Sequence, residues 1–240
     1  MVQAMNKEYL RRTELLLGED AMKRLRDARV IVFGVGGVGS WCAESLVRSG
    51  VGHLTMVDHD VVSPSNINRQ LMATSATIGL PKVEVFRQRL LEISPDAEIT
   101  ACCRRFDAES ATTFGLDGYD CIIDCIDSLK DKMLLIEQAC DTGAFFYSSM
   151  GAALKMDPTR IRVAEFWDVK GDPLARMLRK RFHKEGRTPS RKFQCVYSEE
   201  ILPMMGSRNE DEGRVNGTMA HITAIFGHTL AGLALRDLVG

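Results

Sequence analysis

A glycine-rich turn between an apolar strand and a helix constrains the fold of this chain more than any other feature. Residues 34–39 read Gly-Val-Gly-Gly-Val-Gly and directly follow the apolar run Arg29–Phe33. Such a run is typical of a parallel strand that is covered on both faces. The helical segment that follows, residues 40–49, would direct free N–H groups at a turn whose glycines let an oxyanion approach the backbone. The pattern predicts a phosphate-binding turn, and the alternative is a tight turn that only packs.

The first 150 residues continue this alternation of strands and helices. We expect strands over 54–58, 98–102, 121–127 and 144–148, and helices over 81–93 and 129–142. The rhythm predicts an α/β fold with a doubly wound, Rossmann-like sheet and right-handed crossovers. Ligands of such sheets bind outside the carboxyl ends of the strands, so the glycine turn, Asp58 and Asp127 should meet there.

Two further segments flank this core. Residues 1–28 predict an N-terminal pair of short helices that is broken at Gly18. After Gly151 the composition changes to that of a C-terminal α+β extension. It is expected to hold a strand over 161–165, a helix over 172–185 in the basic segment 172–192, an irregular stretch over 186–215, and a packing helix over 217–239. The expected parts are therefore 1–28, 29–150 and 151–240, within one continuous domain.

Charge and cysteine content narrow the class of protein. The chain has 31 Lys plus Arg against 32 Asp plus Glu, a net charge of -1, so only a local patch could favour a nucleic acid or a membrane. Histidines and charged residues interrupt the apolar run Met219–Val239, which favours a core or dimer helix over a membrane span. Seven cysteines, no secretory signal and no Cys-x-x-Cys pair predict a reduced, cytoplasmic protein without zinc.

Polar residues after the second strand distinguish two kinds of nucleotide site. Asp58 ends that strand, where a carboxylate can accept hydrogen bonds from ribose hydroxyls, as it also does in an NAD-dependent oxidoreductase. Arg69 and Lys82 favour a triphosphate instead, because attack on an α-phosphate requires neutralised charge and the leaving pyrophosphate must be held. Asn66 and Gln70 would supply neutral donors beside these two cations.

Asp127 follows the fourth expected strand at the same edge of the sheet. Mg²⁺ prefers one or two carboxylates together with phosphate oxygens, so Asp127 is a candidate ligand. The alternative is that Asp127 caps the helix over 129–142, a role that Ser128 could also fill.

These motifs resemble those of the ubiquitin-activating-enzyme-like (ThiF-type) adenylyltransferases. The chain carries the GxGGxG turn, the segment D-x-D-x-V-x-x-S-N-x-x-R-Q over 58–70 and G-x-P-K over 79–82. The resemblance implies ATP-dependent adenylation of a carboxylate, with Arg69 and Lys82 as catalytic residues. It also implies that Arg12 reaches the ATP site of a second subunit, with Arg11 as a rival for this role. The implied ATP-binding residues are Gly34, Gly36, Gly37, Gly39, Ser40, Asp58, Asp60, Asn66, Arg69, Gln70 and Lys82.

Within that superfamily, nearly the whole chain resembles the tRNA threonylcarbamoyladenosine dehydratase family. The resemblance is carried by residues 12–18, 37–41, 123–128, 157–163, 172–175 and 195–199. It implies a homodimeric enzyme that activates the threonylcarbamoyl carboxylate of a modified adenosine in tRNA. The side chain then closes on itself, and AMP and pyrophosphate are released. The resemblance further implies Mg²⁺ and a monovalent cation, K⁺ or Na⁺. The loop over 148–152 holds fewer glycines than the family leads us to expect.

A concentrated basic segment is the candidate tRNA contact. Residues 176–192 hold eight Lys or Arg and one Glu in a chain of net charge -1, a focused surplus of the kind that phosphate binding requires. The alternative is a solvated helix face. The candidate residues are Arg176, Arg179, Lys180, Arg181, Lys184, Arg187, Arg191 and Lys192.

Three other functions stay open from the sequence. An activator of a small sulfur-carrier or ubiquitin-like protein would need a thiol near the adenylate, together with a sulfur-transfer or cysteine desulfurase partner, and Cys195 is the one cysteine after Cys140. A non-catalytic ATP-binding regulatory module would need only the glycine turn. An NAD oxidoreductase is the most distant alternative. We interpret Cys121 and Cys125 as packing residues on one buried strand.

Overall fold

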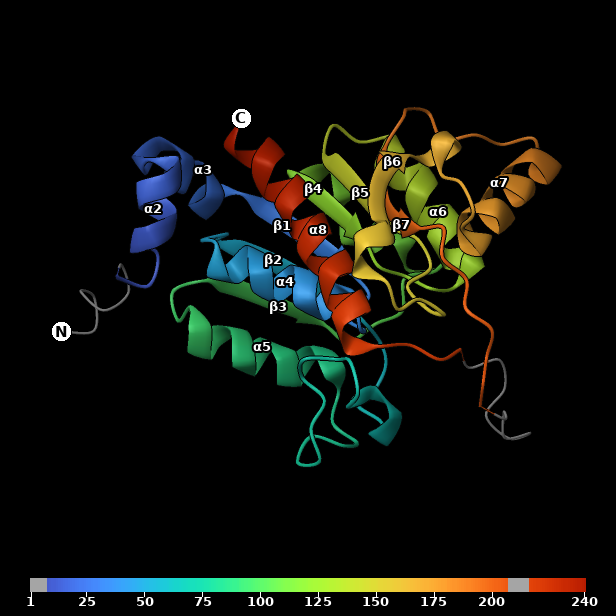
Figure 1. The fold of residues 1–240 in the computed structure, drawn as a ribbon. Helices are drawn as coiled ribbons and strands as arrows, with labels where there is room; N and C mark the ends of the chain where they lie inside the picture. The colour runs from blue at the N-terminus through green and yellow to red at the C-terminus, as the bar shows by residue number, and fades with distance from the viewer. Residues whose placement is uncertain (1–7, 207–215) are drawn as a thin grey trace.

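A seven-stranded sheet organises the chain, as a computed structural model that describes residues 8–206 and 216–240 shows (Figure 1). The strand order is β3-β2-β1-β4-β5-β7-β6, and all paired strands run parallel except β6, which is antiparallel to β7. The strands are β1 Arg29–Phe33, β2 His53–Val57, β3 Glu98–Cys102, β4 Cys121–Asp124, β5 Phe145–Ser149, β6 Ile161–Glu165 and β7 Gln194–Ser198. This order confirms the doubly wound, Rossmann-like prediction.

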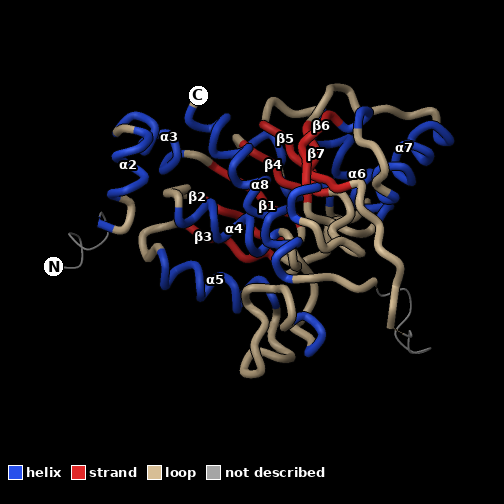
Figure 2. Tube along the Cα trace, in the orientation of Figure 1, coloured by secondary structure: helices blue, strands red, loops and turns tan. Residues whose placement is uncertain are grey.

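Helices cover both faces of the sheet (Figure 2). They are α2 Arg11–Leu17, α3 Glu19–Asp27, α4 Gly39–Arg48, α5 Lys82–Ile93, α6 Leu129–Cys140, α7 Pro173–Glu185 and α8 Ala220–Val239. Side chains alternate along β1, so Val30 and Val32 join the core that packs on α4 and α8, whereas Ile31 and Phe33 join the core on the side of α6 and α7. The apolar run at β1 is therefore buried from both sides.

The N-terminal helices follow the sequence prediction closely. Gly18 separates α2 from α3 and adopts a φ of +82°, a left-handed value that glycine tolerates and other residues avoid. Met22 and Leu25 of α3 are buried, whereas α2 buries no residue. Two leucines of α2, Leu15 and Leu16, are the most exposed apolar side chains of this region.

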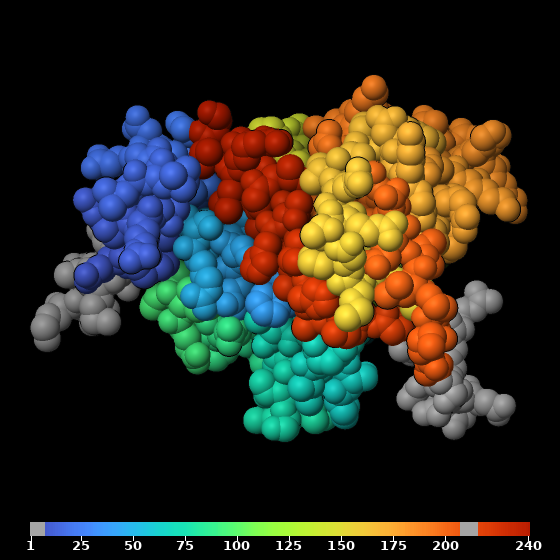
Figure 3. Space-filling view, viewed as in Figure 1, coloured from blue at the N-terminus to red at the C-terminus, as the bar shows by residue number. Residues whose placement is uncertain are grey.

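The apolar segment near the C-terminus forms α8, which is long and apolar enough to cross a membrane by length and composition. In this structure α8 packs along α4 and β5 and crosses the face of the molecule shown in Figure 3. Phe226, Leu230 and Ala231 are buried in the core. A Cβ atom at Gly227 would lie 2.5 Å from the carbonyl oxygen of Val38, so glycine is needed for this close packing. The core-helix interpretation accounts for this segment.

One element of the C-terminal extension was predicted wrongly. The stretch over 186–215 was expected to be irregular, yet it contains β7, which lies between β5 and β6. Residues 207–215 of this stretch lie outside the described residues. Strand β7 is short and has polar neighbours, so its strand character comes from pairing on both sides rather than from a local pattern. Both strands of the extension thus continue the same sheet as the core.

Candidate active site

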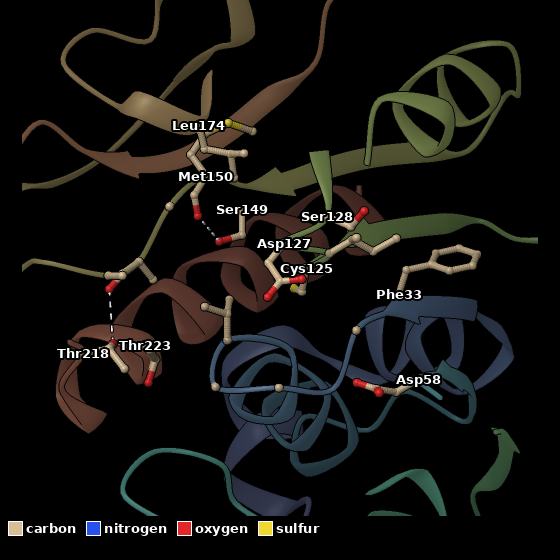
Figure 4. A pocket seen from close by; sticks show the side chains of 18 of the residues that line it. Phe33, Asp58, Cys125, Asp127, Ser128, Ser149, Met150, Leu174, Thr218 and Thr223 are labelled. Carbon is tan, nitrogen blue, oxygen red and sulfur yellow. Dashed lines mark hydrogen bonds between the residues drawn. The ribbon is translucent and has the colours of Figure 1, made fainter. Parts of the chain in front are cut away.

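A cavity of about 890 Å³ opens at the carboxyl ends of β1, β2, β4 and β5 (Figure 4). It lies where the strand order reverses, because β2 flanks β1 on one side and β4 on the other. The glycine turn, the segment after β2, the β4–α6 loop and the loop after β5 all contribute lining residues. Most of the residues that the sequence singled out therefore converge on one cavity.

The glycine turn owes its shape to two close approaches. Gly34 has a φ of +83°, and a Cβ atom there would lie 2.8 Å from the carbonyl oxygen of Cys125. A Cβ atom at Gly39 would lie 1.8 Å from the carbonyl oxygen of Gly34. At Gly36 the nearest neighbour would be Gln70, 3.8 Å away, so the space over this part of the turn is open. The backbone of the turn is thus free to receive a phosphate.

The turn separates residues that face the cavity from residues that support it. Gly34, Gly36 and Gly37 line the cavity, whereas Gly39 and Ser40 are not among its lining residues. Ser40 is fully buried, and its hydroxyl oxygen accepts a hydrogen bond of 3.3 Å from the N–H of Leu71. Both residues therefore stabilise the turn from behind.

Asp58 lines the cavity and also holds the backbone of two neighbouring loop segments in place. One carboxylate oxygen accepts the N–H of Val35 at 2.9 Å, and the other accepts the N–H of Asp60 at 2.9 Å. A carboxylate has about four acceptor positions, so these two bonds leave capacity for a ligand hydroxyl. The sequence predicted a ligand contact at Asp58 and missed the bracing of the glycine turn.

Lys82 and Asp60 form an ion pair at the wall of the cavity. Lys82 begins α5, and its Nζ lies 2.8 Å from Asp60 Oδ2. The lysine side chain is 6% exposed, whereas the aspartate side chain is 52% exposed. The backbone N–H of Lys82 donates to the carbonyl oxygen of Asp60 at 3.0 Å, which fixes the pair from both ends.

Arg69 is half-buried and lines the cavity beside the glycine turn, where a Cβ atom at Gly37 would lie 3.1 Å from its Cγ atom. Its Nη1 donates to the carbonyl oxygen of Ser65 at 2.9 Å and to Asn68 Oδ1 at 2.8 Å. Burial lowers the pKa of the guanidinium, and the negative charge of Asp127 opposes this shift. Since these hydrogen bonds occupy one nitrogen, the remaining donors of the planar group are available to an anion.

Two amide side chains complete this wall. The Oδ1 of Asn66 accepts the N–H of Ser63 at 3.1 Å, so Asn66 shapes the segment before Arg69. Gln70 is buried beside Gly36, and its Oε1 has no hydrogen-bond partner. A buried polar atom without a partner is costly, so this amide, whose residue lines the cavity, is a candidate ligand contact.

Asp127 is exposed in the β4–α6 loop, between the glycine turn and the loop after β5 (Figure 4). Ser128 is the N-cap residue of α6, and its carbonyl oxygen accepts the N–H of Lys132 at 2.9 Å. Asp127 is thus not the capping residue, and its carboxylate faces the cavity. One free carboxylate beside a phosphate site matches the ligand preference of Mg²⁺.

A fully buried ion pair holds the β4–α6 loop from below. Lys132 Nζ lies 2.7 Å from Asp124 Oδ2, and both side chains have no exposed surface. The ammonium also donates to the carbonyl oxygen of Ile126 at 2.9 Å, and Asp124 accepts the N–H of Ile126 at 3.0 Å. No pattern in the sequence indicated Lys132, because a lone lysine near the start of a helix has the pattern of a surface residue.

The loop after β5 contributes a second buried cation. Lys155 is 3% exposed, and its Nζ donates to the carbonyl oxygens of Ser198 at 2.8 Å and Glu200 at 2.7 Å. Asp172 Oδ2 lies 4.0 Å away, and burial raises the pKa of this carboxyl. Leu154 has a φ of 59°, the one positive value of a non-glycine residue in the described part of the chain. Residues 149–155 line the cavity even though the loop holds few glycines.

Three cysteines that the sequence singled out occupy different places in the structure. Cys195 is fully buried in β7, and burial raises the pKa of its thiol well above the ordinary value. Cys121 is buried in β4, as expected for packing. Cys125 lies beyond the end of β4, so its place on the strand was predicted wrongly, but it does pack against the hydrophobic core and also lines the cavity. The expected strand over 121–127 ends at Asp124, because the backbone must leave the sheet to approach the glycine turn.

Half of the candidate tRNA-contacting cations already have partners within the chain. Arg179 donates to the carbonyl oxygen of Phe166 at 2.8 Å, and Arg181 pairs with Glu185 at 2.8 Å. Arg187 pairs with Glu137 and Glu185, and Arg191 donates to the carbonyl oxygens of Ala139 and Ala144. The side chains of the remaining four are exposed and make no hydrogen bond or ion pair with described residues: Arg176, Lys180, Lys184 and Lys192.

Arg12 is exposed on α2 and does not line the cavity of its own chain. Its neighbour Arg11 pairs with Glu14 at 3.1 Å. A role for Arg12 in catalysis therefore requires a second copy of the chain.

This fold and this cavity define a nucleotide-binding α/β protein that places two cations beside a phosphate-binding turn. The chain belongs to the ThiF family, whose profile matches residues 9–240. The resemblance stated from the motifs is thereby confirmed.

Individual relatives refine this assignment. The tRNA threonylcarbamoyladenosine dehydratase of Bacillus subtilis is 35% identical over 239 residues, which cover 95% of this chain and 93% of that protein. The crystal structure of the Escherichia coli tRNA N6-threonylcarbamoyladenosine dehydratase in complex with ATP has a TM-score of 0.87 and 32% identity, covering 97% of this chain and 94% of that one. The molybdopterin-synthase adenylyltransferase of Salmonella typhimurium is 34% identical over 210 residues, covering 86% of this chain and 80% of that protein.

Proposed function

We propose that this protein is an ATP-dependent tRNA threonylcarbamoyladenosine dehydratase, which cyclises the threonylcarbamoyl side chain through adenylation of its carboxylate. The observation that carries the proposal is the meeting of Arg69 and Lys82 with the glycine turn in one cavity. The length-wide similarity to dehydratases of two bacteria supports it.

The chain's own residues would bind and activate ATP. The triphosphate lies against the open backbone of the glycine turn, and the ribose hydroxyls donate to Asp58. The substrate carboxylate attacks the α-phosphorus, and the bond between the α- and β-phosphates breaks. Arg69 and Lys82 stabilise the added negative charge and hold the departing pyrophosphate. The side chain of the substrate then attacks its own activated carbonyl carbon, the bond to AMP breaks, and one water has been lost overall.

The proposal also includes a metal ion, a second subunit, a monovalent cation and a location in the cell. Asp127 fits Mg²⁺, which would offset phosphate charge when bound. Arg12 of a second copy would complete the charge around the triphosphate, so the active form is a homodimer. A monovalent cation is proposed from the family resemblance alone, and a cytoplasmic location from the cysteine content of the sequence.

The test is incubation of the purified protein with ATP, Mg²⁺ and tRNA that carries threonylcarbamoyladenosine. Mass analysis of the nucleosides should show the loss of one water, with release of AMP and pyrophosphate. The variant Lys82→Ala should lower this activity. Its control is Lys23→Gln, which changes an exposed lysine on α3 and should retain the activity. Tight ATP binding without any release of AMP would instead favour the non-catalytic regulatory module.

Activation of a small sulfur-carrier protein is the second candidate, favoured by the similarity to the molybdopterin-synthase adenylyltransferase. This reaction would require a carrier with a Gly-Gly tail to form a complex with the chain. The full burial of Cys195 weighs against a thiol at this position taking part. Pull-down with such a carrier and ATP–pyrophosphate exchange in its presence would separate the two candidates.

A further inference from the structure

The cavity has an apolar end that the ATP-binding residues do not use. Met150, Leu174, Met177, Ile201 and Ala152 line this side of the cavity, and these five residues are called the apolar end below. The buried charges of Lys155 and Asp172 line the cavity as well, and they lie 4.0 Å apart. Met150 and Leu174 lie together on the side of the cavity opposite Asp58 (Figure 4). Met177 and Ile201 are 48% and 53% exposed, so the apolar end reaches the surface. An apolar surface that continues from a nucleotide site suits a flat, weakly polar group of a second substrate.

Helix α7 connects the apolar end with a row of free cations. Its first turns supply Leu174 and Met177 to the cavity. Arg176, Lys180 and Lys184 follow at a spacing of four residues and therefore share one face of the helix, next to the face of Met177. Successive charges lie about 6 Å apart along the axis. We call these three residues the cation row, which begins at the mouth of the cavity and runs away from it.

The cation row differs from the other basic residues of this segment. All three of its side chains are exposed, and none forms a hydrogen bond or ion pair with another described residue. By contrast, Arg179 binds the carbonyl oxygen of Phe166, and Arg181 is paired with Glu185. Folding thus uses the cations on the other faces of α7 and leaves this row available to external phosphates.

We propose that the apolar end receives a base that has left its stack, while the phosphates of the same RNA strand lie along the cation row. A base within a stacked loop cannot enter a cavity of the protein, whereas an unstacked base can enter it and be held by apolar side chains. The charge of the row complements a phosphate backbone, and its position fixes the strand beside the cavity. This inference rests on the proposed function, because it concerns the second substrate of the same reaction.

The cation row is tested through the salt dependence of RNA binding. The variant Lys180→Gln/Lys184→Gln is compared with Lys23→Gln/Arg26→Gln, two exposed cations of α3 far from the cavity in sequence. The ligand is a stem-loop RNA with threonylcarbamoyladenosine in its loop. Loss of two phosphate contacts should reduce the slope of log Kd against log salt by about 1.4. The α3 variant should keep the slope of the unchanged protein, and equal slopes for both variants would overturn the role of the row.

The apolar end is tested with a stem-loop RNA that carries 2-aminopurine at the position of the modified adenosine. Its fluorescence should rise on binding, because the probe is quenched while stacked. Met177→Trp, which fills the apolar end, should abolish the rise, whereas Met177→Ala, which widens it, should retain the rise. Turnover of the natural substrate without any rise for the unchanged protein would refute base insertion and leave the proposed function standing. Absence of both ATP binding and turnover would instead contradict the proposed function.

Discussion

The buried pair of Lys132 and Asp124 offers the sharpest quantitative prediction. Lys132→Met keeps most of the side-chain volume and removes the ammonium that lies 2.7 Å from Asp124 Oδ2. Asp124 would keep only the hydroxyl of Ser148 at 2.7 Å and the N–H of Ile126 at 3.0 Å. Removing one partner of a buried pair costs about 3–5 kcal/mol of unfolding free energy.

The cost follows from complete burial. Asp124 and Ser148 have no exposed surface, so water cannot take the place of the lost ammonium beside the carboxylate. The two remaining neutral donors do not offset the negative charge, so we expect the loss to lie within this range.

Urea unfolding at pH 7 is the assay. Lys130→Met, an exposed lysine on the same helix, is the control and should change stability by less than about 0.5 kcal/mol. The double variant Lys132→Met/Asp124→Asn should recover much of the loss, since no buried charge remains. A deficit for Lys132→Met that equals that of the control, or a double variant that recovers none of the loss, would refute the reasoning.

Four further predictions concern the site and the fold. Arg69→Ala or Lys82→Ala should lower adenylation at least ~10²-fold, measured by ATP–pyrophosphate exchange, and near-normal exchange in both would exclude their assigned role. Gly39→Ala should lower turnover about 10²-fold by displacing the turn, without removing any ligand-contacting group. Glu44 is buried, which opposes ionisation, yet hydrogen bonds from its arginine partners hold the pKa of its carboxyl below the ordinary 4.5. The resulting stability is fully present above pH about 4.5 and is lost as the pH falls through the folded-state pKa, so Glu44→Gln should flatten the acid side of the stability curve. Cys195→Ala should reduce stability and leave turnover unchanged, because its thiol does not face the cavity.

Local patterns in the sequence were sufficient for most of the fold. The apolar run of β1, the glycine turn and Gly18 each carry a signal within a few residues, and the structure has the expected element at each place. Strand β7 carried no such signal, because its five residues become a strand by pairing with β5 and β6. The end of β4 could not be predicted from the sequence either, because the chain leaves the sheet there to bring Cys125 against Gly34.

The site residues could be predicted where a motif fixes their spacing. They were missed where a charged residue belongs to no motif in the sequence and is buried only in the folded chain. Asp58, Arg69 and Lys82 were found because they stand at fixed distances from the glycine turn. Lys132 and Lys155 were missed, since an isolated lysine in a sequence resembles a surface residue until its carbonyl partners are known. The same limit explains why the basic segment could not be divided in advance into cations that fold the chain and cations that are free.

The contact between Lys82 and Asp60 has a consequence for how tightly the site would hold each nucleotide. The ammonium of Lys82 lies 2.8 Å from the carboxylate of Asp60, so a ligand that takes this ammonium must compete with that carboxylate. A nucleoside triphosphate carries more negative charge than a nucleoside monophosphate. On the proposed function, the competition from Asp60 would therefore weaken the binding of AMP more than that of ATP.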